Sequence, residues 1–228
     1  MTEIKSFDFA ELSARDRYKL LIGTVVPRPI ALVTTIDPEG RVNAAPFSFF
    51  NCLSADPAIV ALGVEHRDAV NGKDTGRNIQ LTEEFTVNIV DSALLDAMNV
   101  CAVPFAPEID ELAEAGLEPV PGTKVRCPRI AQAPAALECR RYVGLQIGRS
   151  REIILGEVLA VHLRADLVNE RCHVDPVGLD AVGRMGGHGY VHTRTGFDLP
   201  TMSVDQWQRR LLPARREVGI GQPAEELL

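Results

Sequence analysis

The chain has 228 residues, a mass of 24.9 kDa and a formal net charge of -7. This length predicts one domain over residues 1–200, followed by a C-terminal arm or tail over residues 201–228. The acidic balance excludes a nucleic-acid-binding surface, which requires a basic face. No apolar run approaches the roughly 18 residues of a membrane span, and the N-terminus lacks an apolar signal core, so we expect a cytoplasmic protein without a membrane partner.

The first predicted element is a helix that begins near Ser13 and ends before Pro27. Ser13 and Asp16 form an S-x-x-D start signal, and apolar residues follow at helical spacing. The predicted apolar face consists of Tyr18, Leu21, Ile22 and Val25.

Apolar or alternating runs then predict strands over residues 30–36, 57–64, 84–90, 137–147 and 152–163. The turn signal DPEG follows the first run, and GRSRE lies between the last two. In the run 137–147, Leu137, Cys139, Val143, Leu145 and Ile147 are expected on one face, opposite Glu138, Arg140 and Gln146.

Short helices are expected between these strands, after Asp74, over residues 94–98 behind Asp91 or Ser92, and over residues 109–115 before Gly116. The segment 118–134 is rich in Pro and Gly and predicts a long surface loop. Strands joined by tight turns, with few strand–helix–strand units, favour a mainly β fold with short helices, arranged as an antiparallel barrel.

Several common sites are excluded by the spacing of their residues. No G-x-G-x-x-G follows a strand, no phosphate-binding P-loop or G-x-S-x-G elbow is present, and no nucleophile, base and carboxylate set can be found. His188 and His192 are four residues apart, but they lie in Gly-rich sequence that disfavours a metal-binding helix. The five cysteines have no C-x-x-C spacing, which argues against disulfides and zinc, so most are expected to be buried small apolar residues.

A cationic, phosphate-sized site remains at the helix that Asp74 begins. Lys73 and Arg77 flank its N-terminus, where free N–H groups and a partial positive charge favour anions, and Thr75 and Asn78 add neutral donors. The alternative is a solvated helix end. Arg28 can likewise be a strand-edge residue, and the run NAAPFSFF can belong to the core.

Together these stretches match a family. PRPIALVTTIDPEGRVNAAPFSFFNCLSADP, then KDTGRNI, then EFTVNIV, in this order and spacing, resemble the flavin reductase-like, FMN-binding split-barrel family. LGEV (155–158) and RMGGHGY (184–190) also resemble family features. The resemblance covers roughly residues 18–190 and implies a Greek-key antiparallel split barrel of the kind found in NAD(P)H:flavin oxidoreductases and flavoredoxin.

The resemblance also implies the cofactor and its site. The flavin ring would lie against the backbone of NAAPFSFF, where Ala44 and Ala45 let main-chain N–H groups approach the ring, and the phosphate would meet Ser48 and Lys73 with Thr75 and Asn78. The implied FMN-binding residues are Arg28, Thr34, Thr35, Asn43, Ala44, Ala45, Ser48, Lys73, Asp74, Thr75 and Asn78.

The implied activity is hydride transfer from NADH or NADPH to the flavin, which requires no side-chain acid, base or nucleophile. The family resemblance further implies a homodimer, with a monooxygenase or another electron acceptor as a partner. One departure matters, because some family members carry Gly-Asp-His before the GEV strand, where this chain reads GRSRE. An FMN-bound electron carrier or sensor without NAD(P)H oxidase activity, or a scaffold that has lost its flavin, therefore stays as an alternative.

Overall fold

A computed structural model describes residues 2–65, 74–106, 108–148, 151–214 and 216–218 of the chain. Lys73, which the sequence places in a phosphate site, lies outside these described residues, as do Arg149 and Ser150 of the GRSRE turn.

Seven antiparallel strands form the main sheet, in the order β3-β2-β6-β9-β10-β5-β4. Their bounds are β2 Ala31–Ile36, β3 Val42–Phe47, β4 Phe50–Ala55, β5 Ala58–Glu65, β6 Glu84–Ile89, β9 Ala135–Ile147 and β10 Arg151–Leu163. Three pairs are hairpins of consecutive strands, whereas β6 lies between two strands that are distant in the chain. This order is of the Greek-key type, and it confirms the predicted mainly antiparallel β fold.

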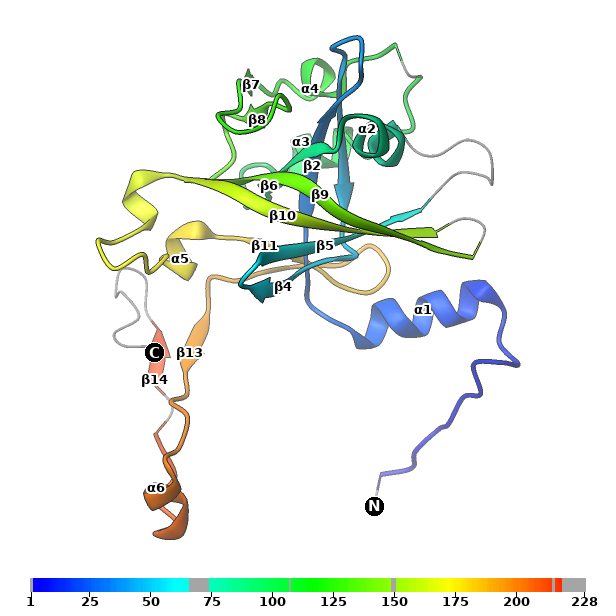
Figure 1. Cartoon of the computed structure of the whole chain (residues 1–228). Helices are drawn as coiled ribbons and strands as arrows, with labels where there is room; N and C mark the ends of the chain where they lie inside the picture. The colour runs from blue at the N-terminus through cyan, green and yellow to red at the C-terminus, as the bar shows by residue number, and fades with distance from the viewer. Residues whose placement is uncertain (1, 66–73, 107, 149–150, 215, 219–228) are drawn as a thin grey trace.

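Smaller elements surround this sheet. The short strands are β1 Arg28–Pro29, β7 Pro119–Val120, β8 Arg129–Ile130, β11 Val182–Arg184, β12 Tyr190–His192, β13 Gly196–Asp198 and β14 Arg216–Val218. The helices are α1 Ala14–Thr24, α2 Asp74–Thr82, α3 Leu95–Val100, α4 Glu111–Glu114, α5 Pro176–Leu179 and α6 Val204–Gln208, with a 3-10 turn at Ala165–Leu167. Figure 1 shows α2 and α4 on one side of the sheet, and α1 with the C-terminal segment on the other.

The core has two parts. One lies inside the curved sheet, where Phe85 and Leu62 are fully buried and the Phe85 ring occupies the space beside Gly156. The other lies between β2, β3, α3 and α4 and includes Leu32, Ala44 and Met98. The helix predicted over residues 94–98 is confirmed as α3, and the Asp91 carboxylate precedes it as expected, accepting a hydrogen bond from the Leu94 N–H at 2.9 Å.

Helix α1 begins as predicted but packs differently. Ser13 caps it by accepting a hydrogen bond from the Asp16 N–H at 3.1 Å. Of the predicted apolar face only Ile22 is buried, while Tyr18, Leu21 and Val25 are exposed. The helix lies beside the barrel rather than across it, so most of its apolar face finds no cover within the described part of the chain.

The predicted faces of β9 are wrong for its second half. Val143 pairs with Leu155 and Arg141 with Gly156, so Tyr142 is an extra residue that interrupts the ladder. Such a bulge reverses the facing of the side chains beyond it. Cys139 therefore points into the core, while Val143, Leu145 and Ile147 are exposed.

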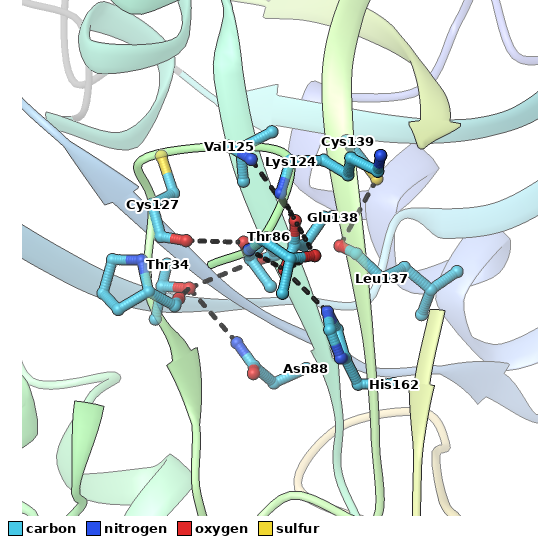
Figure 2. A network of polar contacts seen from close by, with 12 residues as sticks. Thr34, Thr86, Asn88, Lys124, Val125, Cys127, Leu137, Glu138, Cys139 and His162 are labelled. Carbon is cyan, nitrogen blue, oxygen red and sulfur yellow. Dashed lines mark hydrogen bonds and ion pairs between the residues drawn. The ribbon is translucent and has the colours of Figure 1, made fainter. Parts of the chain in front are cut away.

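Glu138 was expected on the polar side of β9, yet it is fully buried. Its carboxylate accepts hydrogen bonds from the backbone N–H groups of Thr123, Lys124 and Val125, and lies 2.6 Å from His162 Nε2. Figure 2 shows this cluster beside the Thr34, Thr86 and Asn88 side chains. The segment 118–134 is therefore not a plain surface loop, because the carboxylate holds it against the barrel and buries Val125, Cys127 and Ile130.

Replacing Glu138 tests this anchor. Glu138→Gln leaves one acceptor oxygen for donors that a carboxylate satisfies with two, so we expect the free energy of unfolding at pH 7 to fall by about 2–4 kcal/mol. Urea denaturation measures the loss, and Glu170→Gln at an exposed position is the control.

The same variant has an expected pH dependence. Burial alone raises the pKa of Glu138, but the N–H groups of Thr123 and Lys124, together with His162, hold that pKa below the usual glutamate range. A carboxyl with a lowered pKa stabilises the fold above its unfolded pKa of about 4.3 and loses this contribution as the pH falls through the folded value. The advantage of wild type over Glu138→Gln should shrink in acid; an advantage that grows would contradict the assignment.

Candidate functional site

Two hollows lie at opposite ends of β3, and most of the predicted site residues lie in or beside them. The small hollow, with a volume of about 180 Å³, is at the start of β3 and is lined by Asn43, Asp74, Asn78 and Glu111 among others. The large hollow, of about 530 Å³, is at the end of β3 and is lined by Pro46, Phe47 and Ser48, with residues of α1, α3 and the β11–β12 hairpin. The predicted ring-binding segment thus ends in the larger of the two.

The large hollow combines flat apolar walls with a few polar groups. Apolar and aromatic contacts come from Tyr18, Ile22, Ile30, Pro46, Phe47, Leu95, Met98, Ala102 and Tyr190. Polar groups come from Arg28, Ser48, Asp96, Asn99, Arg184 and His188. Pockets of this size and character commonly bind small molecules and cofactors.

Arg28 lies in the wall of the large hollow and holds it together. Its guanidinium donates to the carbonyl oxygens of Ile22 and Val25 at 2.8 Å and of Met185 at 3.1 Å. These bonds join the end of α1 to the β11–β12 hairpin. Its buried Nε has no hydrogen-bond partner among the described residues.

Thr34 and Thr35 are fully buried, and both side chains are used inside the protein. The Thr34 hydroxyl donates to the Pro128 carbonyl oxygen, and the Thr35 hydroxyl accepts a hydrogen bond from Asn78 Nδ2 at 3.0 Å. The two threonines therefore position the loop at Pro128 and helix α2, and neither lines a hollow.

Ala44 and Ala45 were expected to offer backbone donors. The Ala44 N–H points away from β2 and donates to Glu111 Oε2 at 3.1 Å. Ala45 pairs with Val33 in the β2–β3 ladder and packs on the core. In this structure the exposed edge of β3 is thus occupied at Ala44 by a carboxylate of α4.

The small hollow brings together the remaining predicted residues. Asn43 Nδ2 donates to Thr75 Oγ1 at 3.0 Å and joins β3 to the start of α2, beside Asp74 and Asn78. Its charges do not favour a phosphate by themselves: Arg41 is paired with Asp37 at 2.6 Å and with Glu39 at 3.5 Å, which leaves Arg77 beside Asp74 and Glu111.

Sequence reasoning assigned no role to Arg184, His188, Tyr190 and Glu111, which line the hollows. The signal for the first three was the RMGGHGY stretch, whose glycines allow a tight hairpin in which Gly187 has a φ of 59°. Glu111 gave no signal, because its contact with Ala44 depends on how α4 packs against the edge of the sheet.

A flavin ring fits the large hollow. The walls offer apolar and aromatic surface for a flat ring, the Ser48 hydroxyl has no partner among the described residues, and Arg28 Nε is buried without one. Ser48 was expected beside Asn78 at the phosphate, but it lines the large hollow whereas Asn78 lines the small one, so Ser48 would meet polar atoms of the ring instead. The phosphate end depends on Lys73, which lies outside the described residues.

Most of the cysteines are buried, as the sequence predicts. All five cysteines are free, and three are buried as expected, with the pKa of the Cys101 thiol raised to about 11 by burial. In the ranges that the structure describes, no group of three or more His, Cys, Asp and Glu is placed to hold a metal ion. None of the helices in those ranges is long and apolar enough to cross a membrane.

Glu111 gives a testable pH effect of opposite sign to Glu138. Burial raises the pKa of Glu111, Asp74 and Asp110 raise it further, and the Ala44 N–H lowers it. A carboxyl with a raised pKa stabilises the fold below its unfolded pKa and loses this contribution as the pH rises through the folded value. Glu111→Gln keeps an acceptor for Ala44 and removes the charge, so we expect it to be more stable than wild type at pH 7.5, but not at pH 4.5.

Urea midpoints at the two pH values measure this difference. Glu114→Gln, at an exposed position of the same helix, is the matched control. A Glu111→Gln protein less stable than wild type at pH 7.5 would show that the charge itself is needed at the Ala44 N–H.

Known proteins share this architecture and sequence. The profile of the flavin reductase like domain matches residues 22–180. A protein of Deinococcus radiodurans is 46% identical over 90% of this chain and 92% of its own. Among solved structures, nitrilotriacetate monooxygenase component B from Bacillus cereus has a TM-score of 0.81 at 30% identity, covering 84% of this chain and 96% of its own.

The 2-nitrobenzoate 2-nitroreductase of Pseudomonas fluorescens has a TM-score of 0.79 at 34% identity, covering 92% of this chain and 99% of its own. The profile match spans most of the barrel, including β3 and the lining of the small hollow, but not Tyr18 or the β11–β12 residues of the large hollow. The two solved structures share the overall fold. The chain therefore belongs to the flavin reductase-like family, and it is a flavin reductase-type enzyme built on a split barrel.

Proposed function

We propose that the protein binds FMN, with the flavin ring in the large hollow, and reduces it with NADH or NADPH. The observation that carries this proposal is the position of residues 46–48. These residues belong to NAAPFSFF, the segment that the family resemblance places against the flavin ring. They line the large hollow together with side chains of α3 and the β11–β12 hairpin.

When bound, FMN supplies the chemistry, since its N5 accepts a hydride from C4 of the nicotinamide. Pro46 and Phe47 offer flat apolar surface that excludes water from the ring, and Ser48 adds a hydroxyl donor. Arg28 and Arg184 place positive charge at the same hollow, which stabilises the negative charge of a reduced ring. No side chain has to act as an acid, base or nucleophile.

We assign the phosphate to the start of α2. Asp74 begins the helix, Thr75 and Asn78 lie in its first turns, and Lys73 immediately precedes it. A helix N-terminus attracts anions through its free N–H groups, although the nearby carboxylates of the small hollow oppose this. The lysine is therefore expected to supply the decisive positive charge.

The function has a direct test. We expect the purified protein to be yellow, to release FMN on denaturation and to oxidise NADH or NADPH when FMN is present. A yellow protein that oxidises neither nucleotide would favour the electron carrier or sensor. The absence of Gly-Asp-His before the GEV strand supports that alternative. A colourless protein that takes up no added FMN would refute the proposal.

Lys73→Ala tests the phosphate assignment. The change removes one charged donor, so we expect FMN affinity to fall by roughly ten- to a hundredfold, whereas riboflavin, which lacks the phosphate, should bind almost as before. Fluorescence quenching measures both dissociation constants. No effect on either ligand would indicate a solvated lysine, and equal losses for both would indicate damage to the fold.

We also propose a homodimer that forms through the outer face of β9, β10 and β5. On this face Leu145 pairs with Ile153 and Val143 with Leu155. Ile153 in turn pairs with Gly63 of β5, and the half-exposed Phe49 side chain lies over Gly63. A continuous apolar surface over three strands is typical of a protein interface, and a second copy would cover it with the same surface.

Leu145→Asp tests this interface. A charge in the centre of a self-complementary apolar face should convert a dimer into a monomer, because two copies of the charge would be buried together. Light scattering after gel filtration gives the mass. Val103→Asp, at an exposed apolar position on another surface, is the control. A dimer that persists with Leu145→Asp would place the interface elsewhere.

We propose that this dimer acts in the cytoplasm and passes electrons to a monooxygenase or a similar acceptor. The likeness to nitrilotriacetate monooxygenase component B supports this role. A reductase of this kind would supply reduced flavin to a separate oxygenase.

A further inference from the structure

The large hollow holds two arginines that face each other. Arg28 on β1 is the register partner of Arg184 on β11, and both line the hollow. Asp96 is the one carboxylate among the lining residues that the structure describes, and no ion pair joins it to either arginine. In a chain with a net charge of -7, this local excess of positive charge calls for an anion.

The two arginines are not equivalent. Arg28 is buried and uses its guanidinium to hold three backbone carbonyl oxygens, so its role is structural. Arg184 is only half-buried and makes one hydrogen bond, from Nη2 to the Gly187 carbonyl oxygen at 2.8 Å. Its other donors have no partner among the described residues, which leaves them available to a ligand.

Arg184 is also held in place. Its guanidinium carbon lies 4.4 Å from the centre of the Tyr190 ring, in a cation–π contact that fixes the direction of the fork. The buried Arg28 beside it adds a second positive charge; burial lowers the pKa of Arg28, Tyr18 raises it, and the field of Arg184 lowers it further. A planar fork of this kind binds carboxylates through two parallel hydrogen bonds.

The surroundings of Arg184 decide which anion fits. Tyr18, Phe47 and Met98 line the same hollow, so an anion at Arg184 has apolar surface within reach. A compact ligand whose negative charge is attached directly to a ring can bind Arg184 and contact the apolar wall at the same time. The pyrophosphate of a nicotinamide dinucleotide is separated from its ring by a ribose, so it fits less well into a hollow shared with the flavin.

We propose that Arg184 is the anchor of a second binding site in the large hollow, which takes a small aromatic carboxylate. The carboxylate binds the free donors of Arg184, and the ring lies against the apolar wall formed with Phe47 and Tyr18. This site deepens the proposed function, on which it rests for the neighbouring flavin, by naming an aromatic acid as the class of the second substrate or effector.

Calorimetry with benzoate tests the site on the full chain, both as purified and after loading with FMN. We expect benzoate to bind, benzamide to bind more weakly and benzylamine not to bind. Arg184→Gln should weaken benzoate by roughly ten- to a hundredfold and leave benzamide unchanged. Arg184→Lys, which keeps the charge but loses the fork, should lie between, and Arg164→Gln at an exposed position outside the hollow is the control.

Salt provides a readout that needs no variant. Benzoate affinity should fall as ionic strength rises, whereas benzamide affinity should not, because only the former depends on charge. Thermal melting of Arg184→Gln checks that the hairpin still folds. If Arg184→Gln does not fold, the benzoate affinity of Arg184→Lys and the salt dependence of wild type test the site instead.

Three results would overturn the inference: no benzoate binding to wild type, equal losses of benzoate and benzamide in Arg184→Gln, or a raised KM for NADH with unchanged benzoate affinity. The last would assign Arg184 to the dinucleotide. FMN binding is measured separately by fluorescence quenching. Flavin uptake without benzoate binding refutes only this inference, and benzoate binding without flavin uptake refutes only the proposed function.

Discussion

The buried carboxylate of Glu138 is the interaction on which the geometry around β2 depends. It lies on the central strand β9 and accepts hydrogen bonds from three consecutive N–H groups, those of Thr123, Lys124 and Val125, in the segment that folds over the barrel. That segment continues to Pro128 and Ile130, whose backbone bonds reach Thr34 and Asn88. A buried charge of this kind is tolerated only because its hydrogen bonds are complete. The polar network therefore holds β2 in place, and β3 pairs with the opposite edge of β2.

The edge position of β3 explains how one strand serves two hollows. It pairs with β2 on one side only, so its other side and both ends are open to α3, α4 and the start of α2. Glu111 takes up the Ala44 N–H in the middle of this open edge. At one end lies the start of α2, and at the other lies the β11–β12 hairpin that Arg28 holds in place. A ligand that extends along β3 meets polar groups of different charge at its two ends.

The sequence was informative wherever the signal was local. The Ser13 cap, the apolar strands β2, β5 and β6 and the turn after Ile36 follow from neighbouring residues, and their order led to the antiparallel barrel. Burial of Glu138 could not be read in this way, because the donors that make it tolerable come from a loop 13–15 residues earlier in the chain. Arg184 reaches the site through a contact that spans 157 residues, from Arg28 to Met185. The bulge at Tyr142 likewise changed which side of β9 is exposed, and no local pattern marks it.

The distribution of charge between the two hollows sets the direction in which an anionic, flat cofactor can lie. The described wall of the small hollow has four carboxylates, Asp37, Glu39, Asp74 and Glu111, against Arg41 and Arg77. A phosphate there needs positive charge from the residues just before α2, where the sequence has Lys73. The large hollow instead has an excess of positive charge, with Arg28 and Arg184 against Asp96, next to apolar walls. With about 3.3 Å per residue, the six residues of β3 separate the two environments by less than about 20 Å. A nucleotide that lay along β3 would therefore meet apolar walls with net positive charge at one end and, at the other, carboxylates whose repulsion of a phosphate Lys73 would have to offset.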